Sequence, residues 1–417
     1  MTTRDTAAAV VRYSGAMRAF TWALGVASVA LCAAATLAQR SDAFNASRDH
    51  EAIGYSTAPV ANAITVLDEK VQRGEVELDF HPVNGYLQSV LEVLKIPHES
   101  QTLSFAQTSL QAKDISRDNP RAVFFRDDVA VAWIRGADLL ELAVQDPRQG
   151  TVFYTVPQTP AARPAFTRND KCLACHLSWE TRGVPGPFVQ TVFPRRSDEE
   201  YANGFTVDHR VPLAERWGGW YVTGARVPTS MGNIPLLQPT MPESGPKRVP
   251  ATSSLKGVFD AHGYPTAFSD VVALMVLEHQ VHATNLITRA GWEYRIKSPL
   301  VSTAVEELVD YLLLVDEAPL PHPVKGSSGF TTAFAAPGPR DNSGRSLRDF
   351  DLQTRLMRYP LSYMIYSPGF DGLPPEVKSM ALTRISDILA GKITHERYAH
   401  LTPELRAAIQ QILAETR

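Results

Sequence analysis

The chain has 417 residues, of which 44% are hydrophobic and 20% are charged, and its formal net charge is −3. This composition is that of a globular protein with two or three structural units. It excludes the strongly basic surface that nucleic-acid binding requires, since neither the whole chain nor any local run is basic enough. Three cysteines are also too few for a disulfide framework.

The N-terminus carries a targeting signal. Arg4, Arg12 and Arg18 come before an uninterrupted apolar run over residues 19–38. Twenty apolar residues are long enough to cross a bilayer as a helix, and the positive flank predicts that residues 1–16 are a cytoplasmic tail. We predict a transmembrane anchor over residues 17–38, with Cys32 facing the membrane. The alternative is a signal peptide cleaved after Ala38. With either an anchor or a cleaved signal peptide, the rest of the chain is expected in the periplasm.

Residues 39–56 are polar and predict a linker, and residues 57–159 predict a small α+β region. Apolar residues recur at helical spacing over 59–73 and over 85–96. Strand patterns follow, at 122–125, 129–134 and 151–156. The first two strands flank Asp127 and Asp128, as in a short hairpin.

Residues 160–246 contain the motif Cys172-Leu173-Ala174-Cys175-His176. Two thiols three positions apart, with a histidine directly after the second, form the attachment signature of c-type haem. Each sulfur would bind one vinyl group of the porphyrin, and His176 would be the proximal ligand of the iron. The rest of this region is rich in proline, glycine and aromatic residues with little periodicity, so we expect an irregular haem-binding segment.

Two other interpretations of the cysteine pair are weaker. A redox dithiol usually follows a βαβ pattern, and no such pattern precedes Cys172. A closed zinc site needs two further cysteine or histidine ligands at close spacing. The nearest later histidine is His209, and the chain has no second cysteine pair.

Residues 247–417 predict a helical C-terminal domain. Helical patterns cover 269–296, 298–317, 346–359, 374–390 and 403–415, and a Gly/Pro/Ser-rich loop spans 319–345. The predicted fold class is therefore mainly α with a small β component (α+β). It comprises an N-terminal membrane anchor, an irregular haem-binding middle region and a helical C-terminal domain.

Several segments together resemble a known group of proteins. These are residues 168–176, 183–186, 208–210, 212–224, 231–233, 273–280 and 345–350. They are similar to an uncharacterised family of bacterial exported proteins called cytochrome c family proteins, and the resemblance covers most of the chain after about Phe153. It implies one covalent haem c and electron transfer, without a known substrate. The family pattern often has a histidine just before Met-Gly-Asn, where this chain has Ser230.

The sixth ligand of the iron decides between an electron carrier and ligand chemistry. Met231 is the first candidate because it lies in a glycine-rich loop, although a packed methionine is an equal alternative. His209 and His282 are alternative distal ligands, and a surface or salt-bridged histidine is the competing interpretation for His209.

Arginines and tryptophans could complete a haem pocket. Arg195, Arg196 and Arg216 could bind the propionates beside Trp217 and Trp220, although surface arginines and core tryptophans are nearly as good an interpretation.

One predicted helix carries a polar stripe. The spacing of Glu278, His282, Asn285 and Arg289 puts all four side chains on one helix face. We favour a hydrogen-bonded network, or a shell around the haem, over a separate metal site with His279.

We therefore predict a membrane-anchored periplasmic c-type cytochrome, a metal-binding protein whose haem iron exchanges electrons with partner proteins of the respiratory chain or periplasm. The alternative is a haem enzyme of peroxidase type, or a haem-based sensor, with an open distal site near Glu278, His282 and Arg289.

Overall fold

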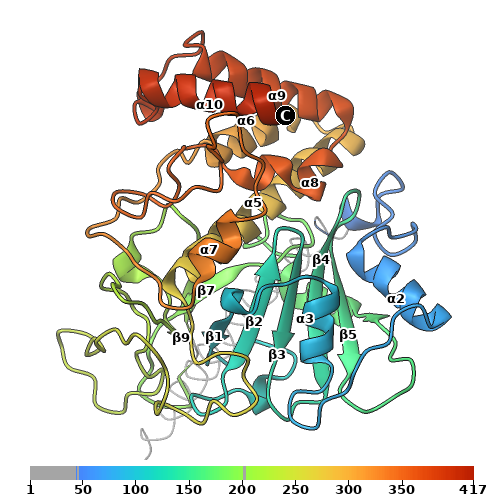
Figure 1. The fold of residues 1–417 in the computed structure, drawn as a ribbon, viewed down its shortest axis with the longest axis vertical. Helices are drawn as coiled ribbons and strands as arrows, with labels where there is room; N and C mark the ends of the chain where they lie inside the picture. Colours follow the sequence, from blue (N-terminus) through green and yellow to red (C-terminus); the bar gives the residue numbers. More distant parts are fainter. Residues whose placement is uncertain (1–43, 45–46, 201–202) are drawn as a thin grey trace, which may run out of the picture.

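The computed structural model describes residue 44 and residues 47–200 and 203–417. Helices make up 33% and strands 15% of the structure. Seven of the described strands form an antiparallel sheet, and two others form a separate two-stranded sheet (Figure 1). The prediction of a mainly α protein with a small β component is therefore wrong. The sequence prediction named three strands. Among those it missed are Leu139–Asp146, whose burial alternates from residue to residue, and two strands of only two residues that show no period.

The sheet has the strand order β6-β5-β4-β3-β2-β1-β9. Its first five strands in the chain form an antiparallel meander in which each strand pairs with the one before it. The hairpin predicted around Asp127 and Asp128 is confirmed. The bounds of the strands are β1 (Thr102–Ser104), β2 (Arg121–Arg126), β3 (Val129–Trp133), β4 (Leu139–Asp146), β5 (Gly150–Pro157), β6 (Thr167–Arg168) and β9 (Trp220–Tyr221).

Helices α2 (Ala63–Arg73) and α3 (Leu87–Val93) cover one face of the sheet (Figure 1). Alternate residues of the central strands point to these helices, and Phe124, Val131 and Leu142 are buried there. The side chain of Asn62 begins α2 by accepting hydrogen bonds from the N–H groups of residues 64 and 65. Both helices predicted in residues 59–96 are confirmed.

The opposite face of the sheet meets α5 (Val271–Arg295), which is buried along most of its length. Its buried residues include polar side chains such as Glu278, His279 and Asn285, which need hydrogen-bond partners in the interior. In Figure 1, α5 runs from the sheet to a layer made by α6 (Val301–Leu312), α9 (Pro375–Leu389) and α10 (Pro403–Thr416). The remaining elements are α4 (Leu173–His176), α7 (Phe330–Ala335), α8 (Pro368–Asp371), β7 (Val189–Val192) and β8 (Gly204–Val207), with short 3-10 helices at His98–Ser100, Ala112–Asp114, Asp170–Cys172, Leu213–Glu215, Tyr363–Tyr366 and Glu396–Tyr398.

Four of the five helices predicted in residues 247–417 are confirmed. The helix predicted over 346–359 is wrong. The Asp351 carboxylate accepts hydrogen bonds from the backbone N–H groups of Gln353 and Thr354, and such a local turn competes with helix formation. The predicted loop 319–345 instead contains the short helix α7.

Residues 160–246, predicted as an irregular middle region, contribute strands to the sheet. They supply β6 and β9, which pair with β5 and β1 at the two edges of the sheet. The chain around the cysteine pair is therefore held by the same sheet that residues 102–157 build.

The predicted membrane anchor at 17–38 and the cytoplasmic tail at 1–16 lie outside the described residues. Within the described part of the chain, no helix combines the length and the apolar character needed to cross a bilayer. The predicted transmembrane helix therefore corresponds to no helix of the described residues.

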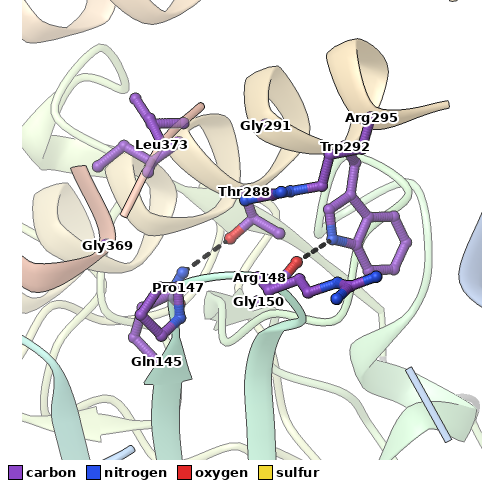
Figure 2. A pocket seen from close by; sticks show the side chains of 11 residues that line it. Gln145, Pro147, Arg148, Gly150, Thr288, Gly291, Trp292, Arg295, Gly369 and Leu373 are labelled. Atoms are coloured by element: carbon purple, nitrogen blue, oxygen red, sulfur yellow. Dashed lines mark hydrogen bonds between the residues drawn. The ribbon is translucent and has the colours of Figure 1, made fainter. Parts of the chain in front are cut away.

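Figure 2 shows the hydrogen bonds between α5 and the turn that joins β4 to β5. Gln145 Nε2 donates to Thr288 Oγ1 over 3.0 Å, and Trp292 Nε1 donates to the backbone oxygen of Arg148 over 3.1 Å. Gly150 lies beside Thr288 with a φ of +83°, and a Cβ there would come within 2.5 Å of the Thr288 methyl group. These contacts set the distance between α5 and the sheet, and therefore the space between them.

Candidate haem-attachment site

The cysteine pair lies on one short helical segment. Asn169 begins it by accepting a hydrogen bond from the N–H of Lys171, and a 3-10 turn then leads into α4. Leu173 is buried in the core between the sheet and α2–α3, which anchors the segment. Cys172 and Cys175 are both free thiols within the described structure.

His176 is held through one ring nitrogen. Its Nδ1 lies 2.9 Å from the carbonyl oxygen of Gly186, and the Gly186 N–H donates back to the His176 carbonyl over 2.9 Å. A carbonyl oxygen can only accept, so Nδ1 carries the proton and Nε2 keeps its lone pair. The ring packs against Phe153 and Phe188, with centroids 4.8 and 5.1 Å away.

The electrostatic surroundings favour neutral groups. Burial lowers the pKa of His176 to about 4; the hydrogen bond to Gly186 opposes this shift, and the charge of Arg121 adds to it. The imidazole is therefore neutral at pH 7, the form that binds metals. Burial raises the pKa of Cys172 to about 11, helped by the charge of Glu141. A reactive redox dithiol needs a lowered thiol pKa, so this environment disfavours that interpretation.

The loop that holds His176 is itself fixed from two sides. Asn285 on α5 donates through Nδ2 to the carbonyl of Pro187 over 2.8 Å, and the N–H of Thr151 on β5 donates to the carbonyl of Pro185. A Cβ on Gly186 would lie 1.8 Å from Asn285 Oδ1. Glycine is required here because the helix side chain and the loop backbone approach so closely.

A cavity of about 660 Å³ opens beside the motif, between the sheet and α5. Its lining includes Cys172, Cys175 and His176. The volume lies within the roughly 300–1,000 Å³ usual for cofactor and small-molecule sites. Small side chains on the cavity-facing side of the sheet leave this space open: Ala130 pairs with Ala143 across β3 and β4, and Ala132 is also in the lining.

The other walls of the cavity are largely apolar, with a few polar groups. Leu277 and Val281 of α5 close it on the helix side. Besides the motif, residues that contribute polar or charged groups are Ser104, Gln107, Thr108, Ser109, Arg121, Glu141, Tyr154, Lys171, Ser178, Glu180 and Gln190. An apolar cavity with few convergent polar groups is the usual form of a cofactor site.

Of the five side chains predicted to surround a haem, Trp220 lines this cavity, and its Nε1 donates to the carbonyl of Gln190 over 2.8 Å. The other four are absent from the described lining and have partners elsewhere. The side chain of Arg195 pairs with Asp198. The Arg196 backbone N–H donates to Glu200. Arg216 and Trp217 both bind the Glu278 carboxylate in the interior.

The three predicted distal ligands also lie away from the described cavity lining. Met231 is buried in a loop, and its backbone N–H donates to the carbonyl of Arg216 over 2.9 Å. His209 is buried with its Nδ1 2.8 Å from Nδ1 of His279. His282 accepts a hydrogen bond from Arg210 at its Nε2 over 3.2 Å.

The polar stripe on α5 is a network of separate pairs. Glu278 pairs with Arg216, Asn285 binds the Pro187 carbonyl, and Arg289 pairs with Glu307. His279 Nε2 lies 2.7 Å from Ser362 Oγ, so both of its ring nitrogens have partners. These side chains therefore each have a partner on another segment of the chain.

The prediction of a metal-binding protein is contradicted within the described structure. In the part of the chain that the structure describes, no group of three or more His, Cys, Asp or Glu side chains could hold a metal ion. His209 and His282 are thus not members of such a cluster. A haem iron takes four of its ligands from the porphyrin and needs one histidine from the protein, which is a different kind of site.

Sequence reasoning missed Arg121, Phe153, Phe188 and the Gly186 carbonyl. The alanines of β3 and β4 carried a usable signal, since small residues alternate with large ones along Val129–Trp133. Arg121, Phe153, Phe188 and the Gly186 carbonyl carried no signal in the sequence, because their roles depend on how distant segments of the chain pack together.

Comparison with known proteins adds no further assignment: no family model, no curated protein and no solved structure matches this chain.

Proposed function

We propose that this protein binds one covalent c-type haem through Cys172, Cys175 and His176 and transfers electrons in the periplasm. The observation that carries the proposal is the combination of the Cys-x-x-Cys-His spacing with a cavity of about 660 Å³ lined by all three of these side chains. The haem supplies one-electron redox chemistry at its iron.

The chain's own residues have distinct roles in this proposal. The thiols of Cys172 and Cys175 would hold the haem, because each could add its S–H across a vinyl C=C bond and form a thioether with no by-product. His176 offers Nε2 to the iron, while its Nδ1–H bond to the Gly186 carbonyl fixes the ring and makes Nε2 a stronger donor. Phe153 and Phe188 restrict the tilt of the imidazole.

Periplasmic location and redox partner proteins belong to the same proposal. Thioether attachment of haem takes place outside the bacterial cytoplasm, and the apolar run before residue 39 agrees with export. The partners would be electron-transfer proteins of the respiratory chain or periplasm.

One observation favours a second candidate function, a haem enzyme or sensor with an open iron site. Among the described residues that line the cavity, His176 is the only histidine, and there is no methionine. An iron with one protein ligand can bind small molecules at its sixth position.

The first test asks whether the haem is bound covalently. We expect the chain, produced with a c-type haem maturation system, to keep its haem stain after denaturing electrophoresis. The absorption spectrum of the reduced pyridine complex of the haem should show that both vinyl groups are saturated. Cys172→Ala or Cys175→Ala should leave one thioether each, and the double variant none. Cys32→Ala is the matched control, because the third cysteine is remote in sequence from the motif. A chain that loses all haem on denaturation would contradict the proposal.

The absorption spectrum of the reduced protein distinguishes the two candidate functions. Binding of carbon monoxide to the ferrous protein, unchanged in Met231→Ala and His209→Ala, would favour the open-site function. A low-spin spectrum that ignores carbon monoxide would favour electron transfer.

A further inference from the structure

Arg121 is the cation that β2 places in the cavity. It occupies the first position of the strand, opposite Ser104 of β1, and it shares the cavity-facing side with Val123. The neighbouring strand position on that side is Ala132, which pairs with Val123. Because alanine is short, the long Arg121 side chain can extend over the sheet toward the motif.

Among the described residues, the guanidinium of Arg121 has no salt-bridge partner, and the charge of Glu141 compensates it only partly. Its Nε is buried and has no hydrogen-bond partner among the described residues. The Glu141 carboxylate also lines the cavity, but it accepts hydrogen bonds from Ser109 and from Gln111. Burial lowers the pKa of Arg121, and Glu141 only partly opposes that effect. Buried arginines are normally paired, because an unpaired buried charge is costly.

Arg121 and His176 face the same space. Both line the cavity, and Arg121 is the charged residue whose field acts on the His176 imidazole. The second cation of the lining, Lys171, is exposed to solvent on the helical segment. A guanidinium presents several donors in a planar fork that fits carboxylates and similar anions.

We propose that Arg121 is an anion-binding residue of this cavity, whose guanidinium pairs with a carboxylate or a small anion of carboxylate size held beside His176. The proposal rests on the proposed function, since the cavity is the haem cavity. The anion has two sources that share this chemistry, a propionate of the haem itself or a free anion such as formate.

The experiment compares the wild type with Arg121→Gln, Arg121→Lys and the control Lys171→Gln, each in the full-length chain. In the first arm, the haem-free proteins are titrated with formate by calorimetry. In the second arm, chains that also carry Cys172→Ala and Cys175→Ala are titrated with iron protoporphyrin and with its dimethyl ester, and quenching of tryptophan fluorescence reports binding.

A propionate partner predicts that the wild type prefers the diacid over the ester by about tenfold or more, and that Arg121→Gln loses this preference while Arg121→Lys keeps part of it. A free-anion partner predicts that Arg121→Gln weakens formate binding by a similar factor, with the porphyrin preference unchanged. Lys171→Gln should behave as the wild type in both arms.

The proposal is overturned if Arg121→Gln stays within about twofold of the wild type in both arms, or if the wild type shows neither formate binding nor a preference for the diacid. Urea unfolding of the haem-free variants adds a readout. Removing a charge that is only partly compensated should leave stability equal or higher, so a large loss of stability in Arg121→Gln would make this arginine structural and overturn the proposal. Failure of the proposed function is a separate result, because the wild type would then carry no covalent haem whatever the formate titration shows.

Discussion

At the scale of single residues, the mutual hydrogen bonds of His176 and Gly186 decide how the motif presents its imidazole. The ring is oriented by a carbonyl from a different segment of the chain, and that carbonyl is placed by Asn285 and Thr151. The donor nitrogen of His176 therefore depends on α5 and β5 as much as on the motif itself.

Gly186→Ala tests this dependence. The new Cβ would lie 1.8 Å from Asn285 Oδ1, so the loop must move, and we expect a loss of about 1–3 kcal/mol in the free energy of unfolding. The imidazole should lose its fixed orientation, which would broaden or shift the absorption spectrum of the haem-loaded protein. Adding Asn285→Ala should recover part of the stability, because it removes the clash. Simple addition of the two single losses would contradict the clash as the cause.

At the scale of elements, α5 and the β4–β5 hairpin enclose the cavity because their separation is fixed by the contacts of Figure 2. Thr288 takes part twice, since its Oγ1 accepts from Gln145 Nε2 and also donates to the carbonyl of Thr284.

Thr288→Val removes both interactions and leaves the Gln145 donor without its partner. Thr284→Val is the matched control, because Thr284 makes the same bond within the helix, to the carbonyl of Gln280, without the contact to the sheet. We expect Thr288→Val to destabilise the protein by about 1 kcal/mol more than Thr284→Val in urea unfolding. Equal losses in the two variants would mean that the bond between α5 and the sheet contributes nothing.

At the scale of the whole molecule, a buried histidine cluster joins distant parts of the chain beneath α5. His209 contacts His279, His279 contacts Ser362, and His282 contacts Arg210. Burial is the largest cause that lowers the pKa of all three histidines, to about 3 for His279 and about 4 for His282. The cluster is therefore neutral in the folded protein at pH 7.

These shifts make stability depend on pH. The unfolded chain binds protons at these histidines below about pH 6.5, whereas the folded chain does not until about pH 4 or lower. The unfolded state thus gains protons as the pH falls, and the free energy of unfolding decreases. For His282 alone, we expect a loss of about 2 kcal/mol between pH 7 and pH 5.

Urea unfolding at the two pH values measures this loss, which should be smaller in His282→Gln than in the wild type. His50→Gln, at an exposed histidine, is the control. A wild-type stability that is constant from pH 7 to pH 5 would show that the cluster is not held neutral.

Local interactions along the chain were enough to predict most helices and the β2–β3 hairpin, and they also define the Cys-x-x-Cys-His segment on which the proposed haem attachment rests. The motif needs only consecutive residues on one helical segment, and a capped amphipathic helix or a short hairpin is specified by neighbours in sequence. Distant segments decided the rest. The two-residue strands β6 and β9 form only because the sheet edges pair with them, and the turn at Asp351 replaced a predicted helix.

The same division applies to the site. The sequence alone determined which residues could bind a haem covalently, because that chemistry depends on spacing. Only the tertiary structure decided which side chains surround the cavity. It brought Arg121, Phe153 and the Gly186 carbonyl to the motif and placed Met231, His209 and His282 elsewhere, since these positions follow from how the sheet, the loop and α5 pack together.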